Sequence, residues 1–173
     1  MRWDAPIKGL LVGASENSGG YGGELAAGPR TGTLNTPQMR QTWYFGKYER
    51  NKLMLAGEYS RLQVLTDIQL AGAPAFVGPS DQGRFYGMAS YKIASKLTGG
   101  LYYSSYLDRK AAFTSARYQK DWALTARYDF NPFLYAKAEQ HFVDGTAIGV
   151  AMSDNPNPQS NMRMTMFKVG VSF

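Results

Sequence analysis

The residues of this chain that could do chemistry are charged side chains placed at alternate positions. Arg127 and Asp129 are two residues apart, as are Lys137 and Glu139, so each pair would project from one face of an extended segment. Charges that line a narrow, low-dielectric passage focus the electric field and bias which ions enter. We predict that eight residues line such a lumen: Arg84, Lys92, Arg127, Lys137, Lys168, Glu58, Asp129 and Glu139.

Two roles fit these eight side chains equally well at this point. The basic residues could give a pore a weak anion preference. They could instead neutralise the acidic residues as interior salt bridges, as a closed eight-stranded barrel would require.

The only histidine, His141, lies two residues from Glu139 and three from Asp144. This raises a hydrolase hypothesis, in which a serine, the histidine and a carboxylate act together at the rim of a barrel. Any chain of this length offers a serine near one histidine, so we expect no enzyme. With no cysteine and no second histidine, we predict no metal site, and we expect no cofactor.

The elements that must position these residues are strands. Apolar residues recur with a period of two, and no run approaches the 18 apolar residues of a membrane-spanning helix. The chain is rich in aromatic residues and glycine, with 12 Tyr, 9 Phe, 3 Trp and 19 Gly, which favours strands and tight corners. The alternation predicts about eight strands: 7–17, 38–50, 53–60, 84–93, 97–104, 122–130, 134–142 and 162–173.

The connections between these strands are expected to alternate between short and long. Short turns are predicted near 49–52, 94–96 and 130–133. Gly-, Pro- and Asn-rich long connections are predicted near 18–37, 66–82 and 144–161, with a shorter one near 108–114. Such alternation is typical of outer-membrane barrels, so the fold class expected is an all-β antiparallel transmembrane barrel, with residues 1–173 as one domain.

A soluble barrel of the lipocalin kind would also alternate, but it would bury its apolar face inward. Charges packed into a dry barrel interior would be costly unless paired, whereas the charged row can line a wet lumen while the apolar face meets lipid. Aromatic residues near the strand ends would form the interfacial girdles: Tyr48, Tyr128 and Phe130 toward the short turns, and Tyr59 and Tyr103 toward the long connections. The net charge of +6 is scattered, so no nucleic-acid partner is expected.

The C-terminal stretch carries a resemblance to a known family. Phe167, Val169, Val171 and Phe173 share one face of a final strand that ends in an aromatic residue. Together with the hairpin 126–133, its continuation 137–147 and the N-terminal stretch 2–10, this strand resembles the C-terminal portion of a Gram-negative porin of the phosphate-selective and related kind. In that comparison, 4–9 would be a turn and Arg2-Trp3 the tail of a preceding strand.

The resemblance implies passive diffusion of small hydrophilic solutes through the bacterial outer membrane. It implies a full barrel of roughly 16 to 18 strands, of which this chain would be the C-terminal half. Expected partners are outer-membrane lipid, the solutes or anions, and the barrel-assembly machinery through the last strand, with a homotrimer left open. Two alternatives stand beside the porin: the rim-site hydrolase, and a small anchoring or adhesive barrel filled by Tyr86, Tyr102 and Tyr106.

Overall fold

The structure, a computed structural model, describes residues 1–147 and 158–171. Within these residues the chain forms one antiparallel sheet of nine strands in chain order and a single short 3₁₀ helix, η1 (Ser115–Arg117). The strands are β1 (Arg2–Asp4), β2 (Leu10–Ala27), β3 (Arg30–Arg50), β4 (Leu53–Leu70), β5 (Phe76–Ala94), β6 (Leu97–Asp108), β7 (Tyr118–Asp129), β8 (Leu134–Gly145) and β9 (Asn161–Val171). A search of the same residues for a helix long and apolar enough to cross a membrane finds none.

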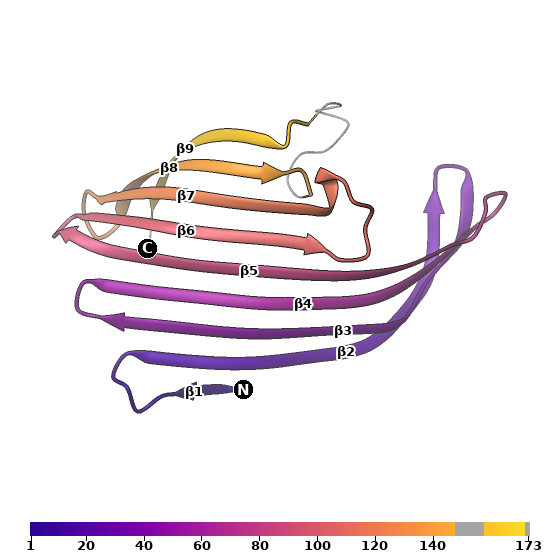
Figure 1. Ribbon diagram of the computed structural model, residues 1–173, viewed down its shortest axis with the longest axis horizontal. Helices are drawn as coiled ribbons and strands as arrows, with labels where there is room; N and C mark the ends of the chain where they lie inside the picture. The colour runs from indigo at the N-terminus through magenta and orange to yellow at the C-terminus, as the bar shows by residue number, and fades with distance from the viewer. Residues whose placement is uncertain (148–157, 172–173) are drawn as a thin grey trace.

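Every strand pairs with its neighbour in sequence, which confirms the all-β antiparallel prediction. Figure 1 shows the strands side by side in a curved sheet, with β2 to β5 projecting well beyond the ends of β6 to β9. β1 and β9 form the two edges, and no pairing joins them within the described residues. β1 pairs with β2 across residues 5–9, so Arg2 and Trp3 lie in a strand that precedes a turn, as predicted.

Two of the predicted long connections are wrong. Most of 18–37 and 66–82 is strand; β2 and β3 are joined by a two-residue turn with Gly28 at φ 62°, and β4 and β5 by the five residues 71–75, with Gly72 at φ 70°. The physical reason is that these extensions carry polar and small residues on both faces, so they lack the alternation that marks a half-buried strand. Backbone pairing holds them, and a register shift between Gly19 and Tyr21 accommodates the Gly-rich run.

The other connections agree better with the prediction. The turns at Asn51-Lys52, Ser95-Lys96 and 130–133 are short, and 109–117 forms a longer connection that contains η1. The predicted connection 144–161 begins after Gly145 and ends at Asn161, and its residues 148–157 lie outside the described residues.

The register places the predicted apolar rows on one face, here called the apolar face. Leu55 pairs with Ala89, Ala89 with Leu101, and Leu101 with Leu124, so these four side chains form a row across β4 to β7. The register also decides the face of β3, because Gly46 pairs with Val12 on the apolar face. Trp43 and Phe45 therefore lie on the opposite face, here called the polar face.

The sheet has almost no buried apolar core. Among the described residues the buried hydrophobic side chains are Ala123 and Val143, at 0% and 6% exposure, and the register puts both on the polar face. On the apolar face Leu124 is 54% exposed and Trp122 50% exposed. This arrangement is the reverse of a soluble barrel, whose apolar face is packed inside.

Candidate functional site: the polar face of the sheet

Four of the predicted lumen cations lie in one row across the sheet. Lys92 pairs with Thr98, Thr98 with Arg127, Arg127 with Lys137, and Lys137 with Lys168. Strands in a sheet are about 4.8 Å apart, so the row concentrates positive charge over a distance of about 20 Å. Sequence alternation could assign these residues to a face, but only the register could align them.

Two members of the row are neutralised by carboxylates on their own strands. Arg127 Nη2 lies 2.7 Å from Asp129 Oδ1, and Lys137 Nζ lies 2.9 Å from Glu139 Oε1. Each pair joins residues two apart, which project from the same face of a strand. The salt-bridge role that the sequence left open therefore applies to these two pairs.

The remaining predicted lumen residues have other contacts. No carboxylate partner is found for Lys92 or Lys168 within the described residues. Arg84 donates to the Gln82 side chain at 3.0 Å and lies 5.6 Å from the centroid of the Tyr106 ring. Glu58 pairs in register with Tyr86.

Sequence reasoning missed one further pair of the same kind. Lys47 Nζ lies 2.6 Å from Glu49 Oε2, and both residues are on the polar face of β3. The sequence contains the same signal, a basic and an acidic residue two positions apart. Trp43 and Phe45 made the face of this segment ambiguous, so the pair could not be assigned to the lumen.

An aromatic and histidine cluster occupies the middle of the polar face. The Tyr102 ring packs against Tyr86 at 6.3 Å and against His141 at 5.7 Å between centroids, above the small side chain of Ala123. His141 Nδ1 lies 2.8 Å from Asp121 Oδ2, and the Tyr102 hydroxyl lies 3.4 Å from both ring nitrogens. His141 is only 3% exposed.

This geometry differs from the one that the hydrolase hypothesis needs. Within the described residues the hydrogen-bond partners of the His141 ring are Tyr102 and Asp121, with no serine among them. Asp144 is on the apolar face, where it pairs in register with Lys120. A search of the same part of the chain finds no group of three or more histidine, cysteine or acidic side chains placed to hold a metal.

The predicted girdle residues all lie on the apolar face. Tyr59 pairs with Phe85 on the side of the projecting strands, and the Tyr103 ring lies 4.6 Å from Trp122. At the short-turn end, the Tyr128 ring lies 5.1 Å from Phe130, and Tyr48 pairs with Leu55. Whether these rings mark membrane interfaces stays a prediction.

The terminal strand also presents apolar side chains. Phe167, Val169 and Val171 pair with Ala138, Ala136 and Leu134, and Phe167 is 83% exposed. Phe173, the predicted terminal aromatic residue, lies outside the described residues.

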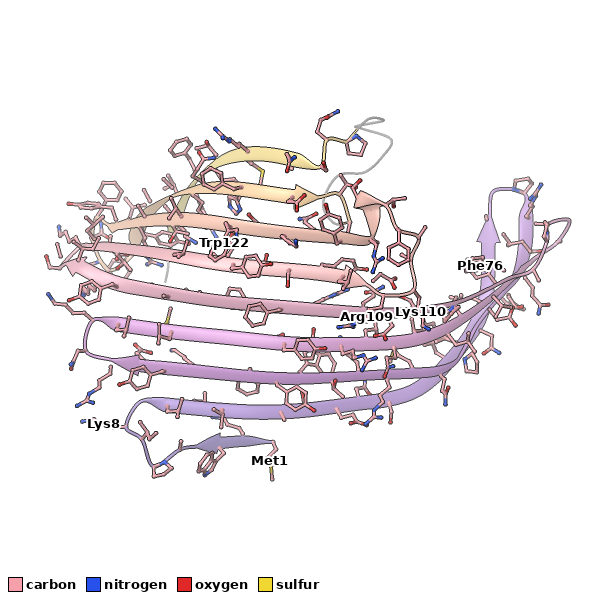
Figure 2. The ribbon with its side chains drawn as sticks, in the orientation of Figure 1. Met1, Lys8, Phe76, Arg109, Lys110 and Trp122 are labelled. Carbon is pink, nitrogen blue, oxygen red and sulfur yellow. The ribbon has the colours of Figure 1, made fainter. Side chains whose placement is uncertain are left out.

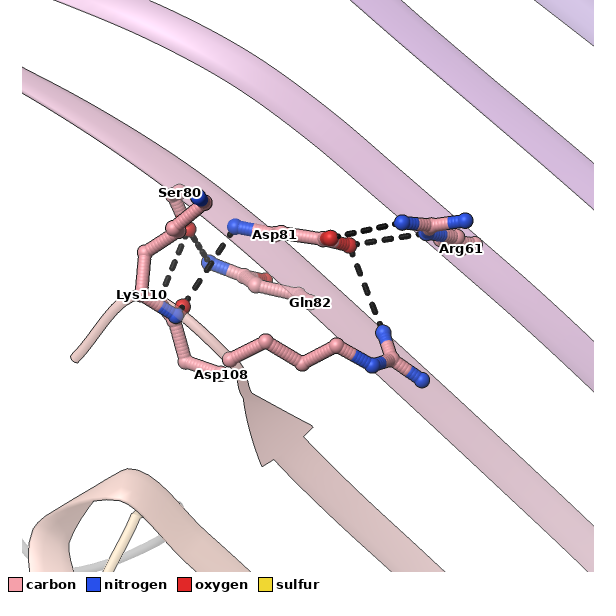
Figure 3. A network of polar contacts seen from close by, with 7 residues as sticks. Arg61, Ser80, Asp81, Gln82, Asp108 and Lys110 are labelled. Carbon is pink, nitrogen blue, oxygen red and sulfur yellow. Dashed lines mark hydrogen bonds and ion pairs between the residues drawn. The ribbon is translucent and has the colours of Figure 1, made fainter. Parts of the chain in front are cut away.

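A charged network ties the 109–117 connection to the projecting strands (Figure 3). Asp81 accepts two hydrogen bonds from Arg61, at 2.8 and 2.7 Å, and one from Arg109 at 3.3 Å. The hydrogen bonds from Arg61 hold the pKa of Asp81 below its ordinary value of 3.8, although burial opposes this shift. A side chain at Gly83 would collide with the Arg109 guanidinium, so this glycine lets the arginine lie against β5. The network lies beyond Tyr59 on the side of the projecting strands, past the end of the exposed apolar rows.

The fold is similar to that of solved outer-membrane proteins. The NanC porin superposes with a TM-score of 0.54 at 12% identity, over 99% of this chain and 90% of the porin chain. The outer-membrane expressed OmpT of Vibrio cholerae gives 0.47 at 13% identity, over 98% of this chain and 62% of that chain. A loop L8 deletion mutant of OmpT gives 0.49 at 12% identity, over 99% and 61% of the two chains.

At these identities the similarity shows a shared fold and no more. This chain spans about three fifths of the OmpT chains with which it was compared. No family model and no curated protein matches the sequence. The nine-stranded antiparallel sheet therefore has the fold of the outer-membrane β-barrels.

Proposed function

We propose that this chain is a porin, or part of one, in the bacterial outer membrane, and that its polar face lines a water-filled path for small hydrophilic solutes. The observation that carries the proposal is the exposure of the apolar face. Leu101, Leu124 and Trp122 are exposed side by side on that face, whereas the buried residues Ala123 and His141 are on the other. An apolar surface of this extent needs a partner, and lipid fits the band of exposed apolar side chains between the short turns and the projecting parts of β2 to β5.

The charges favour a wet polar face. The Lys137–Glu139 pair is only partly buried, and the carboxylates of the row neutralise two of its four cations. In a dry interior the uncompensated ammonium groups of Lys92 and Lys168 would cost several kcal/mol each. Facing water, they cost little and leave net positive charge along the path, which supports a weak anion preference.

Within this proposal, the chain belongs with the phosphate-selective and related porins. The assignment is based on the terminal strand and on the hairpin 126–133 with its continuation 137–147. The two open sheet edges, β1 and β9, fit a larger barrel in which further strands pair with them. Assembly machinery that reads the last strand would act on β9.

One observation favours a second candidate function. Tyr86, Tyr102 and His141 fill space above the middle of the polar face, which suits a small closed barrel with a plugged interior and an anchoring or adhesive role. In that barrel β9 would take the place of β1 beside β2, and little current would flow.

Planar-bilayer conductance of the refolded chain tests the proposal. We expect stable ohmic steps, and in a salt gradient a reversal potential that indicates anion preference. The double variant Lys92→Gln/Lys168→Gln should reduce that preference, because it removes the two cations of the row for which the described residues offer no carboxylate partner. Lys8→Gln is the matched control, since Figure 2 places Lys8 in the turn between β1 and β2, outside the cation row.

Two results would contradict the proposal in different ways. A folded chain that inserts into bilayers without conducting would reject the pore and favour the plugged barrel. A conducting chain whose reversal potential ignores Lys92 and Lys168 would retain the pore but reject the cation row as its filter.

A further inference from the structure

A pocket of about 620 Å³ lies on the apolar face, between β6, β7 and the 109–117 connection. Four residues of β6 line it, Tyr103, Ser105, Tyr106 and Leu107, and three of them are alternate residues that share the apolar face. Tyr118 pairs with Leu107 and adds the β7 side. The pocket therefore opens away from the polar face that carries the cation row, and its volume suits a small ligand.

Two cations stand over aromatic rings in this pocket. The Arg117 guanidinium lies 4.2 Å from the centroid of the Phe113 ring, and Lys120 Nζ lies 5.5 Å from that of Tyr118. Phe113 is 94% exposed, so its ring forms an outer wall that no other part of the described chain covers. A nearby carboxylate, Asp144, accepts a hydrogen bond from the Tyr118 hydroxyl at 3.0 Å.

The chemistry changes along the strands from apolar to cationic. At the lower end of the pocket, the adjoining rings of Tyr103 and Trp122 end the exposed apolar rows. Above them come Lys120 and Arg117. A ligand that fills this gradient needs an apolar part beside the rings and an anionic part at the cations.

The neighbouring charged network extends the positive surface on the same side. Arg61 and Arg109 share the single carboxylate of Asp81, and both guanidinium groups stay partly exposed. Figure 2 shows Arg109 and Lys110 beyond the end of β6, next to the projecting strands. The excess of arginine over carboxylate favours an anion with several acceptor oxygens, such as a phosphate ester.

We propose that this pocket binds the phosphorylated headgroup of a membrane lipid, with the phosphate at Arg117 and Lys120 and an acyl chain against Tyr103 and Trp122. The proposal rests on the membrane position argued above, but not on passage of solute. The exposed apolar face below the pocket favours lipid-borne phosphate over free phosphate, because only the lipid uses both parts of the site.

Native mass spectrometry of the detergent-refolded chain tests this site with defined probes. Dioctanoyl phosphatidic acid supplies phosphate and acyl chains, dioctanoylglycerol supplies the chains alone, and inorganic phosphate supplies the anion alone. We expect one phosphatidic acid to bind with clear preference over dioctanoylglycerol. Arg117→Gln/Lys120→Gln should weaken it at least about tenfold, because charge-assisted hydrogen bonds are lost.

The control removes the same charge from the other end of the strands. Lys8→Gln/Lys96→Gln changes two lysines near the short turns and should leave binding unchanged. Phe113→Ser, at a position too exposed to affect folding, should weaken binding by removing the outer wall. Equal binding by wild type and the Arg117/Lys120 double variant would overturn the proposal. Competition by inorganic phosphate at concentrations equal to the lipid would identify a free-anion site instead and would also overturn it.

The same double variant separates this site from the pore. Arg117 and Lys120 line a pocket outside the polar face, so the bilayer conductance of Arg117→Gln/Lys120→Gln should match that of wild type. A chain that binds phosphatidic acid without conducting would reject the pore and retain the lipid site. A chain that conducts without selective lipid binding would reject the lipid site and retain the pore.

Discussion

Substituting arginine for Leu124 should destabilise the protein in a lipid bilayer far more than the same substitution at its neighbour Thr125. The two residues are adjacent in β7 and point to opposite faces. Leu124 lies in the exposed row of the apolar face, whereas Thr125 is on the polar face and pairs with Glu139. The comparison changes the face and keeps the introduced side chain constant.

The expected size of the effect follows from the position of Leu124 along its strand. It lies five residues from the end of β7 at Asp129 and six from its start at Tyr118. On the apolar face, the exposed row of β7 ends at Trp122, two residues from Leu124 and about 5 Å away along the membrane normal at a typical strand tilt. Leu124 therefore lies inside the apolar band, nearer to one interface than to the middle, and arginine there should cost about 2 kcal/mol.

Guanidinium unfolding of the chain refolded into phosphatidylcholine vesicles, followed by tryptophan fluorescence, measures this cost. At a slope of about 4 kcal/mol/M, a loss of about 2 kcal/mol lowers the midpoint by about 0.5 M. Thr125→Arg should change stability by only about 0.5 kcal/mol, because its charge faces water and a carboxylate. Equal, small effects at both positions would rule out lipid contact at Leu124, since an exposed leucine in a water-soluble protein tolerates arginine.

Three further outcomes follow from individual contacts. The hydrogen bonds from Arg61 lower the pKa of Asp81, so the contribution of Asp81 to stability should be complete above about pH 4 and be lost as the pH falls through the pKa of the folded state. Unfolding midpoints measured against pH should show this loss. The variant Asp81→Asn should no longer show it. Ala123→Leu should cost about 1–3 kcal/mol in denaturant unfolding, because the fully buried methyl group lies beneath the Tyr102 ring. Glu139→Gln should increase the anion preference in reversal-potential measurements, because it leaves Lys137 without its carboxylate.

Sequence periodicity predicted the faces of the strands well because one physical pattern controls them. Leu101 and Leu124 alternate with residues that suit the other face, and the register brings the two leucines together on the apolar face. The same pattern failed at 18–37, where both faces of the projecting strands are polar or small. Composition there resembles a loop, and only backbone pairing with the neighbouring strands reveals the extension.

The candidate site was predictable residue by residue but not as an arrangement. Lys92 and Lys168 are 76 positions apart, and their alignment depends on four successive strand registers. The partner of His141 was missed for the same reason. Its carboxylate comes from Asp121 on the neighbouring strand, whereas proximity in sequence had suggested Glu139 and Asp144.

The contact of one face of the sheet with lipid and of the other with water can be measured directly. The chain contains no cysteine, so Leu124→Cys and Thr125→Cys each introduce a single site for a nitroxide spin label. In vesicles, we expect the label at position 124 to be accessible to dissolved oxygen and shielded from a water-soluble nickel chelate. The label at position 125 should show the reverse, and equal access of the nickel chelate to both labels would show that the two faces do not meet different surroundings.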